Sequence, residues 1–134
     1  MAIKVVKDSI DLGIVTTNGP AMLAFYRDVL GLPHAGDMPM PGGGTMHRLS
    51  CGTSVIKLVV PGRAPGAKAA PGGLAGATGY RYWTITVSNL DETVGAAKAA
   101  GHKIPVPRTA VRPGVEIAMI EDPDGNWVEL LETR

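Results

Sequence analysis

The sequence predicts an α+β fold built from two βαβββ modules, and three observations support this prediction. The order of strand, helix and three short strands occurs twice along the 134 residues. Each predicted helix is followed by a glycine, Gly31 or Gly101, which is a common residue at a helix end. A dense turn at residues 122–126 leads into a closing strand. The chain is therefore predicted to be one domain, 1–134, that contains an internal repeat.

The first module is predicted over residues 1–60. It opens with a strand at 9–15, where Asp11 shares a face with Gly13 and Val15. A helix is expected over 21–30, after Asn18 as N-cap and Pro20 in the first turn. One apolar stripe supports the helix: Met22, Phe25, Tyr26, Val29 and Leu30. Three strands should follow: an irregular edge strand within 32–41, and a hairpin of 45–51 with 54–60.

Residues 61–78 are rich in Gly, Pro and Ala and show no hydrophobic period, which predicts a linker or a lid over a site. The second module is predicted over 79–134. A strand at 80–87 should precede an Ala-rich helix at 90–100, with Asn89 as its N-cap. Three strands complete this module: 103–106, 115–120 and 127–131.

Composition excludes several partners and compartments. The net charge is +1 and no basic tract occurs, so we expect no nucleic acid partner. Cys51 is the single cysteine, which rules out an intrachain disulfide and is typical of a reducing compartment. The first residues lack the apolar stretch of a signal peptide, and no later stretch is long enough to span a bilayer. We therefore expect a cytoplasmic protein with no membrane association.

The repeat places four polar residues at matched strand positions. Asp11 and Tyr82 are central in the two opening strands, and Lys57 and Glu129 occupy matching places in the two closing strands. The two intervals, 46 and 47 positions, are nearly equal. Two copies of one unit can pair about a pseudo-twofold axis, which would bring these four side chains around a shared cleft.

Two motifs carry a resemblance to a known superfamily. The first is Phe25-Tyr26-Arg27-Asp28-Val29-Leu30-Gly31-Leu32, and the second is Asp122-Pro123-Asp124-Gly125-Asn126, which leads to Glu129. Together with the element order, they resemble the vicinal oxygen chelate superfamily over the whole chain. Its members include glyoxalase I, methylmalonyl-CoA epimerase, extradiol dioxygenases, and bleomycin- and fosfomycin-resistance proteins. The resemblance implies a curved mixed sheet around a cleft, and a homodimer.

In metal-using members of that superfamily, the four positions carry two His and two Glu. Here they are Asp11, Lys57, Tyr82 and Glu129, so only Glu129 keeps the usual ligand. A divalent ion repels the Lys57 ammonium, and Tyr82 is an uncommon ligand for such ions. We therefore expect no metal and no other cofactor.

The same four residues suit acid–base chemistry on a small organic molecule. Glu129 or Asp11 can accept a proton, Tyr82 can donate one, and Lys57 can stabilise an enolate or oxyanion. The predicted substrate-binding residues are Trp127, Arg48, Thr84, Val59 and Leu131. This set predicts a metal-independent isomerase, epimerase or lyase.

Three alternatives stand beside this prediction. The protein could bind a small molecule without changing it, as resistance proteins of the superfamily do. The charged residues could form only a structural ion-pair network. A divalent-metal-dependent lyase, isomerase or dioxygenase is the third alternative. His34 and His102 lie near element ends and are expected at the surface, and of the neighbours His47 and Arg48 only one can face the cleft.

Overall fold

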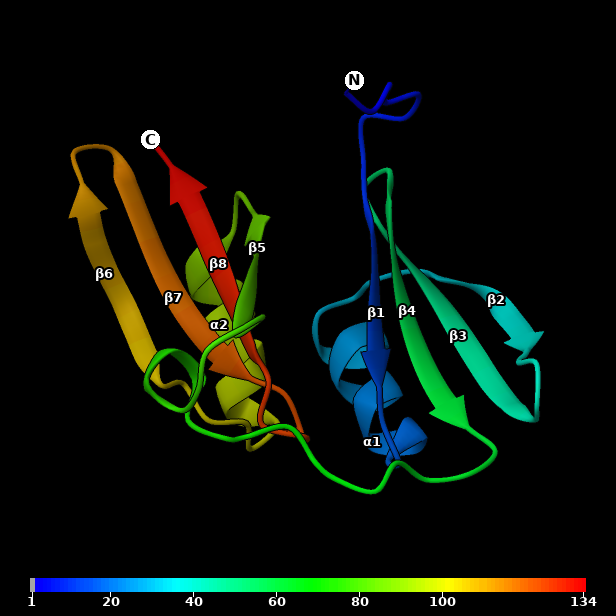
Figure 1. The fold of residues 1–134 in the computed structure, drawn as a ribbon. Helices are drawn as coiled ribbons and strands as arrows, with labels where there is room; N and C mark the ends of the chain where they lie inside the picture. Colours follow the sequence, from blue (N-terminus) through cyan, green and yellow to red (C-terminus); the bar gives the residue numbers. More distant parts are fainter. Residues whose placement is uncertain (1) are drawn as a thin grey trace. The chain divides into compact units, whose positions relative to one another are not determined.

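The computed structural model describes residues 2–134, which divide into two compact units. The first unit ends at Gly66 and the second begins at Ala67, so the division falls inside the segment predicted as a linker. Each unit holds one four-stranded mixed sheet with a helix lying across one face (Figure 1). The predicted α+β fold of two βαβββ modules is confirmed.

The first unit contains six elements: β1 (Asp11–Val15), α1 (Gly19–Leu23), a π-helical segment (Ala24–Val29), β2 (His34–Pro39), β3 (Gly44–Cys51) and β4 (Ser54–Pro61). The strand order in the sheet is β1-β4-β3-β2. Strands β1 and β4 run parallel, and the other neighbours run antiparallel. As predicted, β2 is an irregular edge strand, with a bulge between His34 and Gly36.

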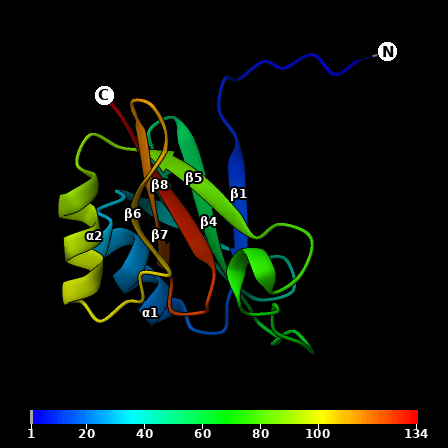
Figure 2. The same ribbon diagram turned by 90° about the vertical axis from the view of Figure 1, so that its left-hand side faces the viewer.

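The second unit repeats this arrangement with a short 3-10 turn (Gly73–Ala75), β5 (Tyr82–Thr86), α2 (Leu90–Ala99), β6 (Val106–Arg112), β7 (Val115–Glu121) and β8 (Trp127–Thr133). Its strand order, β5-β8-β7-β6, matches that of the first unit element for element (Figure 1). Figure 2 shows helix α2 along one side of this sheet. The predicted internal repeat is thus confirmed. No helix among residues 2–134 has the length and apolar character needed to cross a bilayer.

The core of each unit lies between its helix and one face of its sheet. The alternation of side chains along the strands sends one set into this core and leaves the other set on the opposite face. The largest fully buried residues are Met22, Phe25, Tyr26, Leu49, Ile56 and Leu58 in the first unit and Leu90, Ile120, Val128 and Leu130 in the second. Lys57 and Glu129 alternate with buried neighbours and therefore lie on the face away from the helix.

Three local predictions need correction. The strand predicted at 103–106 is wrong except for its last residue, because β6 begins at Val106. The helix predicted at 21–30 begins at Gly19 and continues from Ala24 as a π-helix. Asn18 and Asn89 occupy the two N-cap positions, but neither side chain makes a capping hydrogen bond.

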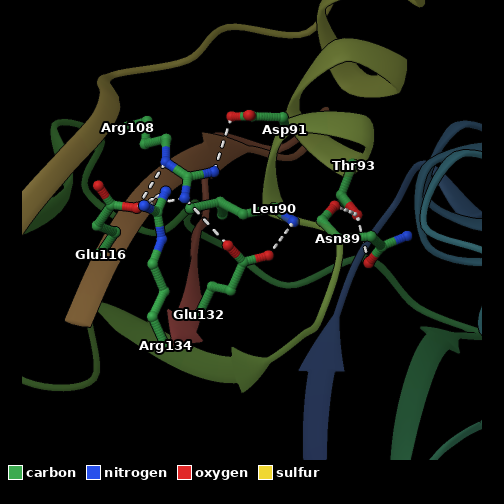
Figure 3. A network of polar contacts seen from close by, with 8 residues as sticks. All are labelled: Asn89, Leu90, Asp91, Thr93, Arg108, Glu116, Glu132 and Arg134. Carbon is green, nitrogen blue, oxygen red and sulfur yellow. Dashed lines mark hydrogen bonds and ion pairs between the residues drawn. The ribbon is translucent and has the colours of Figure 1, made fainter. Parts of the chain in front are cut away.

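A distant carboxylate caps helix α2 instead. Leu90 N–H donates to Glu132 Oε1 of β8 over 3.0 Å, and Arg108 Nη2 lies 3.0 Å from Glu132 Oε2 (Figure 3). Arg108 also pairs with Glu116 and with Asp91 of the helix. The Leu90 hydrogen bond, followed by Arg108, holds the pKa of Glu132 below its ordinary value. This network ties the helix to three strands.

Candidate functional site

In the first unit, two of the predicted catalytic residues meet on the sheet face opposite the helix. Asp11 lies opposite Val55, and Gly13, two residues further along β1, lies opposite Lys57. Lys57 Nζ is 3.2 Å from Asp11 Oδ2, and Lys7 Nζ is 2.8 Å from Asp11 Oδ1. The hydrogen bond from Lys7, and then that from Lys57, keeps the pKa of Asp11 below its ordinary value. Asp11 is thus an ionised carboxylate held between two ammonium groups.

Positive charge and apolar surface share this face of the first sheet. Arg48 of β3 lies directly opposite Lys57, so it is Arg48 that shares this face, while His47 lies on the other. Val55 and Val59 flank Lys57 on the same strand face. With three cations and one carboxylate, this face suits the anionic group of an organic ligand.

In the second unit, the face opposite the helix carries Glu129. Thr84 of β5 lies opposite Glu129 in the β5–β8 ladder, and its hydroxyl donates to Glu129 Oε1 over 2.8 Å. Within the described residues of this unit, no basic side chain forms an ion pair with Glu129. The half-buried Glu129 carboxylate therefore has a hydroxyl partner and no cation beside it in this unit.

Tyr82 and Trp127 lie opposite each other in the β5–β8 ladder. Each lies two residues before Thr84 or Glu129 in its own strand. Tyr82 is 46% exposed, so its phenol is accessible to a ligand. Trp127 Nε1 donates to Glu121 Oε1 over 3.2 Å, which fixes the edge of the indole. Leu131 follows Glu129 on the same strand face. This face therefore combines a carboxylate, a phenol and an indole.

One face of the indole is covered by the segment predicted as a linker or lid. A Cβ atom built on Gly73 would overlap the Trp127 ring, so the backbone of this turn packs directly against the indole. Arg81 fixes the turn by donating from Nε to Gly73 O and from Nη2 to Ala70 O, each over 2.7 Å. The 3-10 turn is therefore part of the second unit and leaves less of Trp127 for a ligand than predicted.

The structure thus joins Asp11 with Lys57 in one unit, and Glu129 with Thr84 in the other. Sequence reasoning missed Lys7 as a partner of Asp11, although their spacing of four residues is visible in the sequence. It also missed Gly73 and Arg81. Only the density of Gly and Pro in their segment could have indicated a built turn.

The repeated βαβββ topology, with polar residues at matched positions of two sheets, defines a protein of the glyoxalase-like class. A family model for the Glyoxalase/Bleomycin resistance protein/Dioxygenase superfamily matches residues 9–130, and the chain belongs to this superfamily. A comparison with curated proteins gave no match.

Solved structures show the same fold. A glyoxalase family protein from Bacillus cereus matches with a TM-score of 0.77 at 19% identity, covering 98% of this chain and 96% of that one. A glyoxalase I variant from Zea mays matches with a TM-score of 0.75 at 20% identity, covering 90% of this chain and 43% of that one. TioX from Micromonospora sp. ML1 matches with a TM-score of 0.66 at 18% identity, covering 92% and 94%. At these identities the likeness establishes the fold alone.

The superfamily's usual metal positions do not fit a metal in this chain. In the first unit, the Lys57 ammonium contacts Asp11, the only carboxylate at these two positions, so a divalent ion there would meet a positive charge. In the second unit, the two positions carry Glu129, a common metal ligand, and Tyr82, whose phenol is an uncommon ligand for such ions. The residues at these four positions thus form two polar pairs rather than a ligand set.

Proposed function

We propose that this protein is a metal-independent isomerase, epimerase or lyase that moves a proton on a small organic molecule, with Glu129 as the general base. The observation that supports the proposal is the contrast between the two candidate carboxylates. Asp11 contacts two ammonium groups, whereas Glu129 accepts one hydroxyl hydrogen bond and has no cation beside it in its unit. The hydrogen bonds from Lys7 and then Lys57 lower the pKa of Asp11, which weakens Asp11 as a proton acceptor.

The neighbours of Glu129 fit this role. The hydrogen bond from Thr84 occupies Oε1 and orients the carboxylate, so the proton would add at Oε2. Tyr82, two residues before Thr84 on the same strand face, is the proposed proton donor. Lys57 and Arg48 belong to the first unit, where they supply positive charge for an anionic group, and Asp11 positions Lys57.

Deuterium exchange tests the proposal on a range of compounds, so the substrate need not be identified first. Protein dialysed against a chelator is incubated in D₂O with a panel of small ketones, 2-hydroxy acids, 2-oxo acids and acyl thioesters. Proton NMR then follows the loss of the C–H signal next to each carbonyl group. Wild-type protein should exchange at least one compound, and Glu129→Gln should slow that exchange by about 10²–10⁴-fold.

Glu132→Gln is the matched control for this experiment. It makes the same chemical change on the same strand, but Glu132 contacts helix α2 and Arg108 instead of the candidate face. The control should keep its exchange rate at a temperature where it is folded. A Glu129→Gln protein that exchanges as fast as wild type would contradict the proposal.

Ligand binding without catalysis is the second candidate, and the accessible phenol of Tyr82 beside the Trp127 indole favours it. Here no compound of the panel would exchange in any variant. A compound that binds would keep its affinity within a few-fold in Glu129→Gln, as measured by calorimetry.

We also propose a homodimer in the cytoplasm as the working form. Support for the dimer is the resemblance to paired superfamily members, and support for the location is the single cysteine, Cys51. Burial raises the pKa of the Cys51 thiol, which makes it a poor nucleophile. Sedimentation equilibrium should give twice the chain mass of 13.9 kDa, and a single-chain mass would contradict the dimer.

A further inference from the structure

A second polar cluster lies on the other face of the first sheet, at its β2 edge. Asp37 of β2 lies directly opposite His47 of β3. Asp37 Oδ1 is 2.7 Å from His47 Nδ1 and 2.6 Å from His34 Nε2. These three side-chain atoms all lie within 4.8 Å of one another. Two imidazoles therefore converge on one carboxylate oxygen.

A bulge in β2 creates this convergence. His34 and Asp37 are three positions apart, so a regular strand would send their side chains to opposite faces. The pairing register shifts between His34 and Gly36, and the extra residue returns both side chains to one face. Gly36 has a φ of +141°, a conformation that side-chain-bearing residues rarely adopt. The local sequence thus supplies the glycine that the bulge requires.

The cluster is anchored on one side and open on the other. The side chain of His47 is 17% exposed and lies beside Gly19 at the start of α1: a Cβ atom on Gly19 would be 3.9 Å from His47 Nε2. Asp37 is 49% exposed and His34 is 27% exposed. An ion held by the three atoms would therefore have a fixed inner ligand and free coordination positions toward water.

We propose that His34, Asp37 and His47 form a binding site for a divalent first-row transition metal ion, with water in the remaining coordination positions. Two imidazole nitrogens and one carboxylate oxygen favour Zn²⁺, Co²⁺, Ni²⁺ or Fe²⁺ over Mg²⁺ and Ca²⁺, which prefer oxygen ligands. Three protein ligands and an open position are also the pattern of metal sites that activate water.

The distances suit such an ion after a small adjustment. Ligand atoms about 2.0–2.2 Å from one metal ion lie on the order of 3 Å apart. The two nitrogen–oxygen distances therefore need to open by a few tenths of an ångström, which is easy at an exposed strand edge. The ring nitrogens that face Asp37 must be unprotonated to bind an ion, so each bound imidazole would carry its proton on the other ring nitrogen.

This site is separate from the positions that hold metal in the superfamily. His47 and Lys57 belong to neighbouring strands, but the register pairs Lys57 with Arg48 and places His47 on the helix-covered face. The proposal therefore does not depend on the proposed proton-transfer function, and either can fail alone.

Metal titration of the full chain tests the proposal. Protein free of any His tag is dialysed against a chelator, exchanged into buffer at neutral pH, and titrated with Co²⁺ by visible absorption and with Zn²⁺ by calorimetry. Wild type should bind one equivalent of each ion. Asp37→Asn and His34→Ala should lower the affinity at least tenfold, because each removes a ligand. Both residues are exposed, so circular dichroism should show folded variants.

Gly36→Ala tests the geometry without removing a ligand. It keeps all three ligand side chains but disfavours the backbone conformation of the bulge, so the affinity should also fall. Two controls should bind as wild type: His102→Ala, which changes the one remaining histidine, and Glu129→Gln, which changes the one residue that keeps the superfamily's usual ligand.

Three results would overturn the proposal. The first is a wild-type protein that takes up neither ion at about 1 mM, a weak affinity for any specific site. The second is uptake that Asp37→Asn and His34→Ala leave unchanged. The third is uptake that Glu129→Gln abolishes while Asp37→Asn keeps it, which would assign the ion to the superfamily positions.

Discussion

The two units share one topology but fix the start of their helices by different means. In the second unit, the Glu132 carboxylate accepts the Leu90 N–H at the start of α2. Val60 stands at the matching place of β4, and it packs so close to Gly19 that a Cβ atom there would lie 2.9 Å from Val60 Cγ2. The first unit thus uses close apolar packing where the second uses a charged cap. Strand alternation fixes the topology, and the junctions are free to differ.

The candidate faces differ in the same way. Lys57 and Glu129 hold matching places in β4 and β8. Lys57 pairs with Gly13, two residues after Asp11, and Glu129 pairs with Thr84, two residues after Tyr82. The first face carries a closed ion pair and excess positive charge, whereas the second carries a carboxylate with a hydroxyl partner. This difference teaches that duplicated positions can carry different chemistry, and our proposed function assigns proton acceptance to the second face.

Matched core substitutions should have the largest effect on stability. Leu58 and Leu130 each follow the candidate residue of their strand and are almost fully buried. Leu58→Ala and Leu130→Ala should each lower the free energy of unfolding by about 2–5 kcal/mol, because each leaves a cavity against the helix. Urea denaturation followed by circular dichroism measures both. A loss below about 1 kcal/mol in one variant would show that this unit does not depend on its core in the way described.

Gly73→Ala should have a smaller effect that is confined to the second unit. Its new methyl group would collide with the Trp127 ring, and its φ of +53° disfavours any side chain, so the free energy of unfolding should fall by about 1–3 kcal/mol. Gly79→Ala is the control, because Gly79 also has a positive φ but nothing within 4 Å of a Cβ atom. In a Trp83→Phe background, Trp127 emission should shift to longer wavelength only in Gly73→Ala. Equal emission in both variants would contradict the packing of the turn on the indole.

The charged cap of α2 should have the smallest effect, and one that depends on pH. The folded-state pKa of Glu132 is lowered by the Leu90 hydrogen bond and then by Arg108. As the pH falls, this carboxylate is therefore protonated in the unfolded chain before it is protonated in the folded chain. The stabilisation is therefore complete above the ordinary carboxyl pKa of 4.5 and is lost as the pH falls through the lower folded-state value. Glu132→Gln should lower Tm by a few degrees at neutral pH, and less at about pH 3. A variant whose Tm differs from wild type by the same amount at both pH values would contradict this account.

Alternation of side chains made most strands and the repeat predictable. Edge strand β6 was misplaced because its residues are mostly exposed and leave no apolar period to read. The cap of α2 was not predictable either, because Glu132 lies 42 positions after Leu90. Asn89, the local candidate, occupied the right position without making the bond.

The candidate site shows the same limit. Pattern matching found Asp11, Lys57, Tyr82 and Glu129, but residue type alone could not show that Asp11 is held by two lysines while Glu129 is not. The convergence of two histidines on Asp37 was not predicted, because spacing in the sequence does not reveal a bulge. Features that depend on register or on distant partners needed coordinates.

A direct comparison of Asp11→Asn and Glu129→Gln tests the central claim, that Glu129 rather than Asp11 is the base. Both substitutions replace a carboxylate by its amide, and the exchange rate of one compound in D₂O by chelator-treated protein is the readout. The account predicts a loss of about 10²–10⁴-fold for Glu129→Gln and of no more than about tenfold for Asp11→Asn. The reverse order, or equal losses, would contradict it.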